Sequence, residues 1–316
     1  SMTDEVGLQV LVDNYRQTQA INMILSQGMK VFDNQVRLMR MLEKAGRLNR
    51  TVEFLPDDEE LVDRATARVG LTGPEVAVLM SYAKIWVFDE LKDSSLPDDV
   101  AFADELSAYF PTPLRKKYAK EINNHRLKRE IIATLATNSI INRVGGTFIS
   151  RIVERTGMPV GDVVAAYVIA RRVLDMRAVW ERIDVLDNKI PASVQTNMRL
   201  DTNKLLEWVT LWFLRNGHRP LDIGSHVDEF ADGFKELNEC LGTALPKRYQ
   251  RDVIQRGQPY VKAGAPKDLA RSIADMVNLY SGCDIVRLAA TNKMTVTDTA
   301  KLYYAVGTRF RLGTLR

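Results

Sequence analysis

Residues 141–174, INRVGGTFISRIVERTGMPVGDVVAAYVIARRVL, contain the patterns of this chain that are closest to a binding motif. The glycine pair in RVGGTF could cradle a phosphate, because backbone N–H groups before a helix can converge on an anion. The part ERTGMPVGDVVAAY could be the turn and second helix of a DNA-reading helix-turn-helix. The third interpretation is that the whole segment is structural.

The residue types around these motifs favour the structural interpretation. Neither G-x-G-x-x-G nor G-x-x-x-x-G-K-[ST], the glycine patterns of nucleotide loops, occurs in the chain. Gly145 and Gly146 follow a helical pattern instead of a strand, which predicts a helix stop before a new helix at Thr147. The second helix, DVVAAYVIARRVL, has few polar side chains near its start, where base recognition needs them. We therefore expect that helix to be buried.

Other catalytic or metal-binding patterns are missing from the sequence. The histidines His125, His218 and His226 form no H-E-x-x-H pair, and Cys240 and Cys283 lack metal-ligand spacing. His218 and His226 lie in NGHRPLDIGSH, where we expect surface or capping roles. No G-x-S-x-G is present, and the many carboxylates are expected on solvated helix faces. The sequence thus assigns no catalytic, cofactor-binding or metal-ligating residue.

Two basic clusters are the remaining candidates for a binding surface. They are Arg115-Lys116-Lys117-Lys120 and His125-Arg126-Lys128-Arg129, and Glu121 and Glu130 interrupt them. No series of aromatic side chains accompanies them, and the net charge of the chain is only +4. This pattern favours a solvated or partner-binding surface over a nucleic-acid-binding one.

The elements that carry these residues are predicted to be helices. Phe32, Val36, Met39 and Leu42 repeat at helical spacing up to a stop near Gly46. Asp57 is expected to cap a helix that runs to Gly70, and TGPE at residues 72–75 has the form of a capping box before a helix that ends ahead of Pro97. Asp98 and Thr112 are expected to begin further helices. Because no strictly alternating run is bounded by turn residues, we predict an all-α fold.

Two helical segments carry more specific expectations. In HRLKREIIATLATNSIINR, apolar residues lie on both sides of the helix, which predicts a central, buried position. Asn138 interrupts one apolar stripe, so we expect it to be buried with a hydrogen-bond partner. In LLEWVTLWFL, Trp208 and Trp212 share a face that we expect to point into the core. This run has about half the length of a membrane span, so no membrane anchor is predicted.

The chain also contains two similar segments. Residues 141–176 and 277–312 align without a gap, with identities that include Asn142/Asn278, Gly146/Gly282, Asp162/Asp298 and Tyr167/Tyr303. We predict a multi-helix bundle with a repeated helix-turn-helix-turn-helix unit. In each copy the glycine is expected to end a helix, and the aspartate to lie in the first turn of the last helix. The expected organisation is an N-terminal helical segment, residues 1–97, and a helical domain, residues 98–316, that contains both copies.

Several strings resemble one family, the large NAD-specific bacterial glutamate dehydrogenases. They cover nearly the whole chain: TDEVGLQVLVDNYRQTQA, FLPDDEEL, GLTGPEVAVLMSYAKI, YFPTPLR, HRLKREIIATLATNSIINRVGGTF, LDNKIPASVQ and TVTDTAKLYYAVGTRFRL. The resemblance is to the helical region that follows the dehydrogenase core in these long proteins. It implies that residues 1–97 follow that core, and that the chain is a C-terminal part of a longer polypeptide.

What the resemblance implies about function concerns mainly the full-length protein. That protein would be a cytoplasmic, homo-oligomeric enzyme that oxidises L-glutamate to 2-oxoglutarate and ammonia with NAD. The family's nucleotide-binding glycine motif and glutamate-binding lysines have no counterpart here, so no catalytic residue and no cofactor is carried over. We therefore expect a non-catalytic module whose partner is the upstream core. The alternative is a free-standing helical adaptor or nucleic-acid-binding protein.

Overall fold

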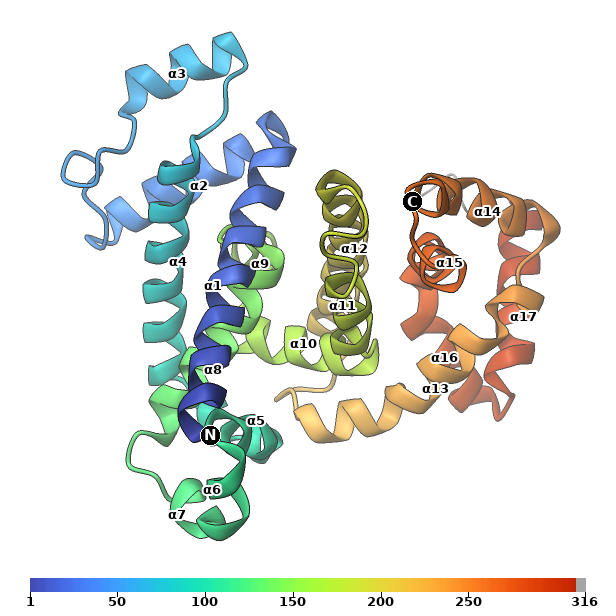
Figure 1. Ribbon diagram of the computed structural model, residues 1–316. Helices are drawn as coiled ribbons and strands as arrows, with labels where there is room; N and C mark the ends of the chain where they lie inside the picture. The colour runs from blue at the N-terminus through green and yellow to red at the C-terminus, as the bar shows by residue number, and fades with distance from the viewer. Residues whose placement is uncertain (311–316) are drawn as a thin grey trace. The chain divides into compact units, whose positions relative to one another are not determined.

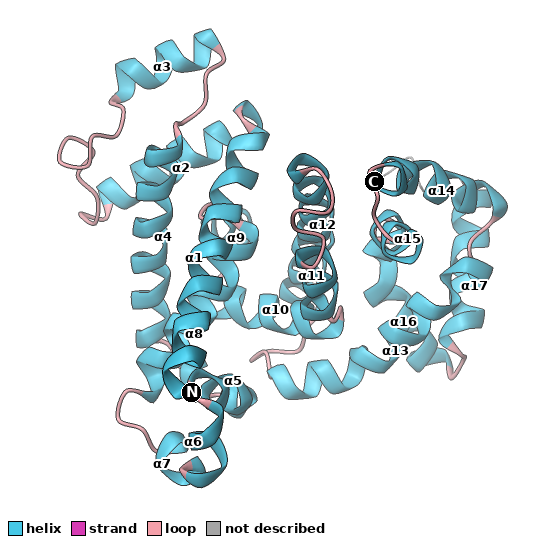
Figure 2. Ribbon diagram, viewed as in Figure 1, coloured by secondary structure: helices cyan, strands magenta, loops and turns pink. Residues whose placement is uncertain are grey.

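The computed structural model describes residues 1–310 of the chain. Within these residues every regular element is a helix and no strand is present (Figure 2). This confirms the all-α prediction, which rested on helical spacing of apolar residues. The chain forms two compact units, Ser1–Ala165 and Ala166–Arg316. The expected boundary at residues 97 and 98 falls inside the first unit, and a division at that position stays a prediction.

The first unit contains helices of very different lengths (Figure 1). In chain order they are α1 (Met2–Gln27), α2 (Met29–Lys44), α3 (Asp58–Ala67), α4 (Gly73–Asp93), the 3-10 helices η1 (Leu96–Asp98) and η2 (Val100–Phe102), α5 (Ala103–Tyr109), α6 (Thr112–Lys117), α7 (Ala119–Asn123), α8 (Lys128–Val144) and α9 (Phe148–Thr156).

The core of the first unit forms where α4 packs along α8 and α1 lies against both helices. The prediction that α8 is central is confirmed, because it buries apolar side chains on several sides, namely Ile131, Ile132, Ala136, Ile140 and Ile141.

The burial of Asn138 on α8 differs from the expectation. It is only half-buried, and it makes no side-chain hydrogen bond among the described residues. One turn further on, Asn142 is the asparagine that is buried.

Local signals fixed several helix ends in this unit. Asp57 caps α3 by accepting a hydrogen bond from the Glu60 amide, and Thr72 and Glu75 form the predicted capping box of α4. Other bounds differ from the prediction. The helix expected from Asp98 begins only at Ala103, after two 3-10 turns, and the helical segment expected from Thr112 is broken at Tyr118 and again after Asn123. Asparagine competes with helix formation through its side-chain amide, which accounts for the second break.

Helix α3 stands apart from the bundle of α1, α4 and α8, and loops join it to α2 and to α4 (Figures 1 and 2). It buries a single side chain, Leu61. Because one leucine stabilises a ten-residue helix only weakly, polar contacts must contribute much of its attachment.

Helix α10 (Val160–Val173) continues from the first unit into the second. The second unit then contains α11 (Met176–Asp184), α12 (Ala192–Asn216), α13 (Ile223–Ala244), α14 (Lys247–Lys262), α15 (Lys267–Asp275), the 3-10 helix η3 (Asn278–Ser281), α16 (Gly282–Asn292) and α17 (Val296–Arg309).

In the second unit α13 packs against α16 and α17, and α14 packs against α15. Two glycines allow α13 and α16 to approach closely. A Cβ on Gly233 would lie 2.6 Å from Val286, and one on Gly282 would lie 2.5 Å from the Phe234 ring. The prediction that Gly282 ends a helix is therefore wrong. Gly282 is the first residue of α16 with helical φ of −57°, and its small size serves packing.

The tryptophan pair of α12 is also placed differently from the prediction. Trp208 is 43% exposed and stacks on Tyr280 with ring centroids 5.4 Å apart. Trp212 is half-buried, and its Nε1 donates to Asp284 at 2.8 Å. The fully buried side of α12 is formed by Leu206 and Phe213 instead.

None of the helices within residues 1–310 is long and apolar enough to cross a membrane.

Candidate functional site

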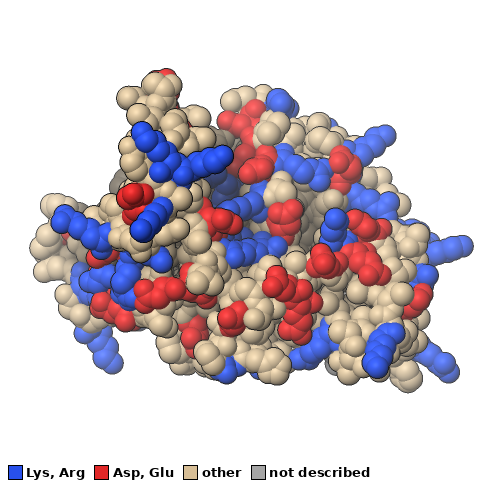
Figure 3. All heavy atoms as spheres, turned by 90° about the horizontal axis from the view of Figure 1, so that it is seen from below, with Lys and Arg blue, Asp and Glu red and all other residues tan. Residues whose placement is uncertain are grey.

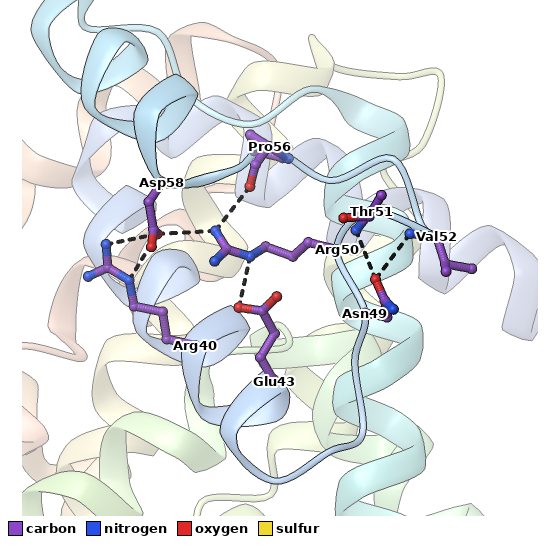
Figure 4. Close-up of polar contacts among 8 residues, drawn as sticks. All are labelled: Arg40, Glu43, Asn49, Arg50, Thr51, Val52, Pro56 and Asp58. Atoms are coloured by element: carbon purple, nitrogen blue, oxygen red, sulfur yellow. Dashed lines mark hydrogen bonds and ion pairs between the residues drawn. The ribbon is translucent and has the colours of Figure 1, made fainter.

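A dense cluster of charged contacts lies at the connection between α2 and α3 (Figure 4). Arg50 is at its centre, with a side chain that is only 13% exposed. Its Nη1 donates to Asp58 Oδ1 and to the Pro56 carbonyl oxygen, both at 3.2 Å. Its Nε lies 2.8 Å from Glu43 Oε2 on α2. The guanidinium thus joins α2, the connecting loop and the first turn of α3.

Two neighbours complete this cluster. Arg40 on α2 donates from Nε and Nη2 to the same Asp58 oxygen, at 3.3 and 3.1 Å. Asn49 Oδ1 accepts the amides of Thr51 and Val52 at 3.1 and 3.3 Å, a side-chain turn that shapes the loop (Figure 4). Hydrogen bonds from Arg50 and Arg40 hold the pKa of Asp58 below its usual value.

The other end of α3 is attached by a second arginine. Arg64 Nη1 and Nη2 donate to the two carboxylate oxygens of Glu75, at 2.7 and 2.9 Å, in a bidentate pair. Glu75 Oε2 also accepts the Thr72 amide at 2.7 Å and so caps α4. Burial raises the pKa of Glu75, but the hydrogen bonds from Arg64 and Thr72 outweigh burial, and the pKa lies below its usual value.

The charges in these contacts compensate one another. Each of the three arginines faces a carboxylate, so its charge is already compensated. Asp58 and Glu75 have lowered pKa values, which makes them weak bases at neutral pH. Within the described part of the chain no three His, Cys, Asp or Glu side chains are grouped to hold a metal ion. The arrangement is suited to attaching α3 at both ends.

The structural interpretation of Gly145 and Gly146 is supported by their backbone and packing. Gly145 ends α8 with φ of +93°, a conformation that favours glycine. A Cβ on Gly146 would lie 3.4 Å from Ala83 and Met80 on α4. The pair therefore stops one helix and allows close packing on another, and the next helix starts at Phe148, with Thr147 at its cap.

The helix expected to be buried is buried. In α10, the residues from Val163 to Ala170 are each at most 4% exposed. A helix that reads DNA must present its face to a groove, so α10 cannot serve as a recognition helix in this conformation.

The three histidines have different local surroundings. His125 Nδ1 accepts the Leu127 amide at 3.1 Å, and His218 is exposed. His226 is 5% exposed, which contradicts the expected surface position. Its Nδ1 lies 2.7 Å from the Asp222 carbonyl oxygen, and its ring packs edge-on against Phe213. The sequence NGHRPLDIGSH looked like a loop, but Ile223 already starts α13 and turns His226 inward.

The two basic clusters divide into structural and exposed residues. Arg115 pairs with Glu5 and donates to Phe110 O at 2.7 Å, while Arg129 pairs with Asp98. The exposed remainder includes Lys116, Lys117 and Lys120. On the face drawn in Figure 3, basic and acidic side chains are interspersed. This mixture matches the sequence expectation of a solvated surface better than a phosphate-binding stripe.

Sequence reasoning missed the arginine contacts of α3. A signal was present, since Asp57-Asp58-Glu59-Glu60 is an acidic run flanked by Arg40, Arg50 and Arg64. Which arginine meets which carboxylate depends on the path of the loop, and residue types alone do not give that path.

Comparison with known proteins identifies the family. A sequence model described as "Glutamate dehydrogenase, C-terminal" matches residues 68–316. The chain belongs to this family. It is 38% identical over 311 residues to the NAD-specific glutamate dehydrogenase of Halomonas elongata, and 38% identical over 316 residues to that of Pseudomonas aeruginosa. The corresponding Mycobacterium tuberculosis protein is 31% identical over 314 residues.

The match covers nearly all of this chain but little of the relatives. It spans 98% of the chain for the first two proteins and 99% for the third, and 19% of each relative. The chain therefore corresponds to the C-terminal fifth of these dehydrogenases, and the family resemblance noted in the sequence is confirmed.

Proposed function

We propose that the chain is a non-catalytic C-terminal helical module of an NAD-dependent glutamate dehydrogenase. The full-length enzyme would convert L-glutamate, NAD and water to 2-oxoglutarate, ammonia and NADH in the cytoplasm. The observation that carries this proposal is the match to three NAD-specific glutamate dehydrogenases over 98–99% of the chain but only 19% of each of them.

The all-helical fold of the described residues supports the proposal that the upstream core, and not this module, binds NAD. A dinucleotide site of the usual kind needs a strand, a glycine-rich turn and a helix. Residues 1–310 form helices without a strand, so the described part of this chain offers no such unit. NAD and glutamate would be bound by the upstream core, and the module would support that core, its assembly into a homo-oligomer, or its regulation.

The test compares three preparations: the 316-residue chain, the full-length polypeptide, and the full-length polypeptide without the module. We expect calorimetric titration of the chain with NAD to give no saturable binding, and an assay with glutamate and NAD to give no turnover. The full-length polypeptide should turn over glutamate. Removal of the module should lower the thermal midpoint of the core if it supports the fold, change the sedimentation coefficient if it supports assembly, or change only the kinetics if it regulates. Saturable NAD binding by the chain alone would refute the proposal.

A further inference from the structure

The N-terminal half of α1 carries an unusual concentration of exposed apolar side chains. Residues 2–15 include six large ones that are at least 40% exposed: Met2, Val6, Leu8, Val10, Leu11 and Tyr15. The first buried side chain of the helix is Ala20. A helix on the surface of a soluble domain normally turns its apolar stripe inward, so this half of α1 has the reverse pattern.

These side chains form an ordered face. At about 100° per residue, Leu8, Leu11 and Tyr15 fall within one narrow sector of the helix, and Val10 lies on the far side of Gly7. Leu8 is 61% and Leu11 67% exposed. A Cβ placed on Gly7 would meet nothing within 4 Å. The face therefore has a small residue at its centre and large apolar residues on both flanks, which lets another backbone approach closely.

The opposite side of the same segment is fixed to the first unit by polar contacts. Glu5 accepts hydrogen bonds from the Thr112 amide and hydroxyl, at 2.9 and 2.6 Å, and pairs with Arg115 at 3.2 Å. Gln9 Nε2 donates to the Ala108 carbonyl oxygen at 3.3 Å. Figure 1 shows this end of α1 beside α5 and α6. The helix is thus held in place while the side chains of Leu8, Val10 and Leu11 stay exposed.

The chemistry of this face narrows the class of partner. The segment VGLQVLV, residues 6–12, contains no charged side chain. Nucleic acid and anionic headgroups require cationic contacts, which this face does not provide. A contiguous exposed apolar patch on a soluble protein is typical of a protein interface. A complementary apolar helix or sheet surface would fit over Gly7.

We propose that the upstream part of the same polypeptide, the dehydrogenase core, packs on the α1 face formed by Gly7, Leu8, Val10 and Leu11. This inference rests on the proposed function. It follows from the position of the matched region, because the relatives match only over the C-terminal 19% of their length and most of each protein precedes it. Helix α1 is the first element of this region, so the preceding chain enters beside the uncovered face.

The experiment is hydrogen–deuterium exchange on the full-length enzyme and on the 316-residue chain. Amides of residues 2–15 should exchange more slowly in the full-length enzyme than in the separate chain, by a factor of about ten or more. The reason is that packing adds to the free energy of local opening. Leu11→Lys in the full-length enzyme should return the exchange to the rate of the separate chain. Val62→Lys on α3 is the matched control, since Val62 is 62% exposed and lies on another helix. It should leave the protection intact.

A thermal melt of the 316-residue Leu11→Lys variant checks that the substitution leaves the fold intact. Because Leu11 is 67% exposed, its replacement should not change the melting temperature. Equal exchange of residues 2–15 in the two wild-type preparations would overturn the inference. So would protection that rises with the concentration of the separate chain, which would assign the face to a second copy. Loss of protection in both lysine variants would also overturn it. The outcome of the glutamate assay does not depend on the exchange experiment. Failure of the proposed function can therefore be distinguished from failure of this inference.

Discussion

Replacing Glu75 with alanine should loosen α3 and the start of α4 together. The Glu75 side chain is 11% exposed and joins the two helices by accepting from both Nη atoms of Arg64 and from the Thr72 amide. Alanine removes all three hydrogen bonds. Arg64 keeps one partner, Glu60 on its own helix, so its charge stays partly compensated.

The magnitude follows from two contributions. Loss of a helix cap costs about 0.5–2 kcal/mol, and loss of hydrogen bonds between charged groups costs about 1.5–3 kcal/mol. Because the remaining pair with Glu60 offsets part of the second contribution, we expect a total of about 2–3 kcal/mol. Glu90→Ala is the matched control on the same helix, since Glu90 is exposed, and it should change the stability by less than about 0.5 kcal/mol.

The loss of stability caused by Glu75→Ala should be smaller at acid pH than at neutral pH. The folded-state pKa of Glu75 lies below the usual 4.5, so its carboxylate contributes stability that is fully present above about pH 4.5 and is lost as the pH falls through the folded-state pKa. The difference between wild type and Glu75→Ala should therefore shrink in acid. Urea unfolding at pH 7 and at successively lower pH measures it, and hydrogen exchange of residues 58–93 locates it. A difference that stays constant through this range would refute the assignment of the stability to the ionised carboxylate. A zero coupling energy in the double-mutant cycle with Arg64→Ala would refute the contact itself.

Three further outcomes are expected. Gly145→Ala should destabilise the chain by about 1–3 kcal/mol in urea unfolding, because φ of +93° strains any residue with a Cβ; an unchanged midpoint would contradict the helix-stop role. Asn138→Leu should change the stability by less than about 0.5 kcal/mol, since the half-buried side chain loses no partner among the described residues; a loss above 1 kcal/mol would restore the original expectation of a buried polar pair. The Cys283 thiol, whose pKa burial raises, should react with a thiol reagent only as the second unit opens, and rapid labelling in native buffer would contradict its burial.

The predictions of helix ends that succeeded depended on short stretches of chain. The cap at Asp57, the capping box of Thr72 and Glu75, and the stop at Gly145 each involve backbone groups within four residues of the residue named. Such interactions involve only neighbouring residues, so a short stretch of sequence contains the information they require.

Several predictions that failed concerned which face of a helix is covered. Trp208 and Asn138 lie at helical spacing on stripes that were expected to be buried, yet both are partly exposed. Periodicity identifies an apolar stripe but not the element that lies on it. The arginine contacts of α3 were missed for the same reason, because Arg40 and Asp58 are brought together by a loop of 13 residues between α2 and α3. The uncovered face of α1 could be recognised only once its neighbours were known.

The internal repeat stays a prediction, and the helix stops offer a way to test it. At the offset of 136 residues, Thr156 and Asn292 end α9 and α16, and Val160 and Val296 begin α10 and α17. The equivalent stop residues, Gly157 and Lys293, both have left-handed φ, of 68° and 54°. The first helices of the two segments do not match, because α8 ends at Val144 whereas a 3-10 helix precedes Gly282. If the stops are equivalent, Lys293→Gly should stabilise the chain and Gly157→Ala should destabilise it, each by about 1 kcal/mol, because a left-handed backbone costs an L-residue about that much. Urea unfolding measures both changes. Changes of the same sign would mean that the two turns play different structural roles, and the repeat would then be a coincidence of sequence.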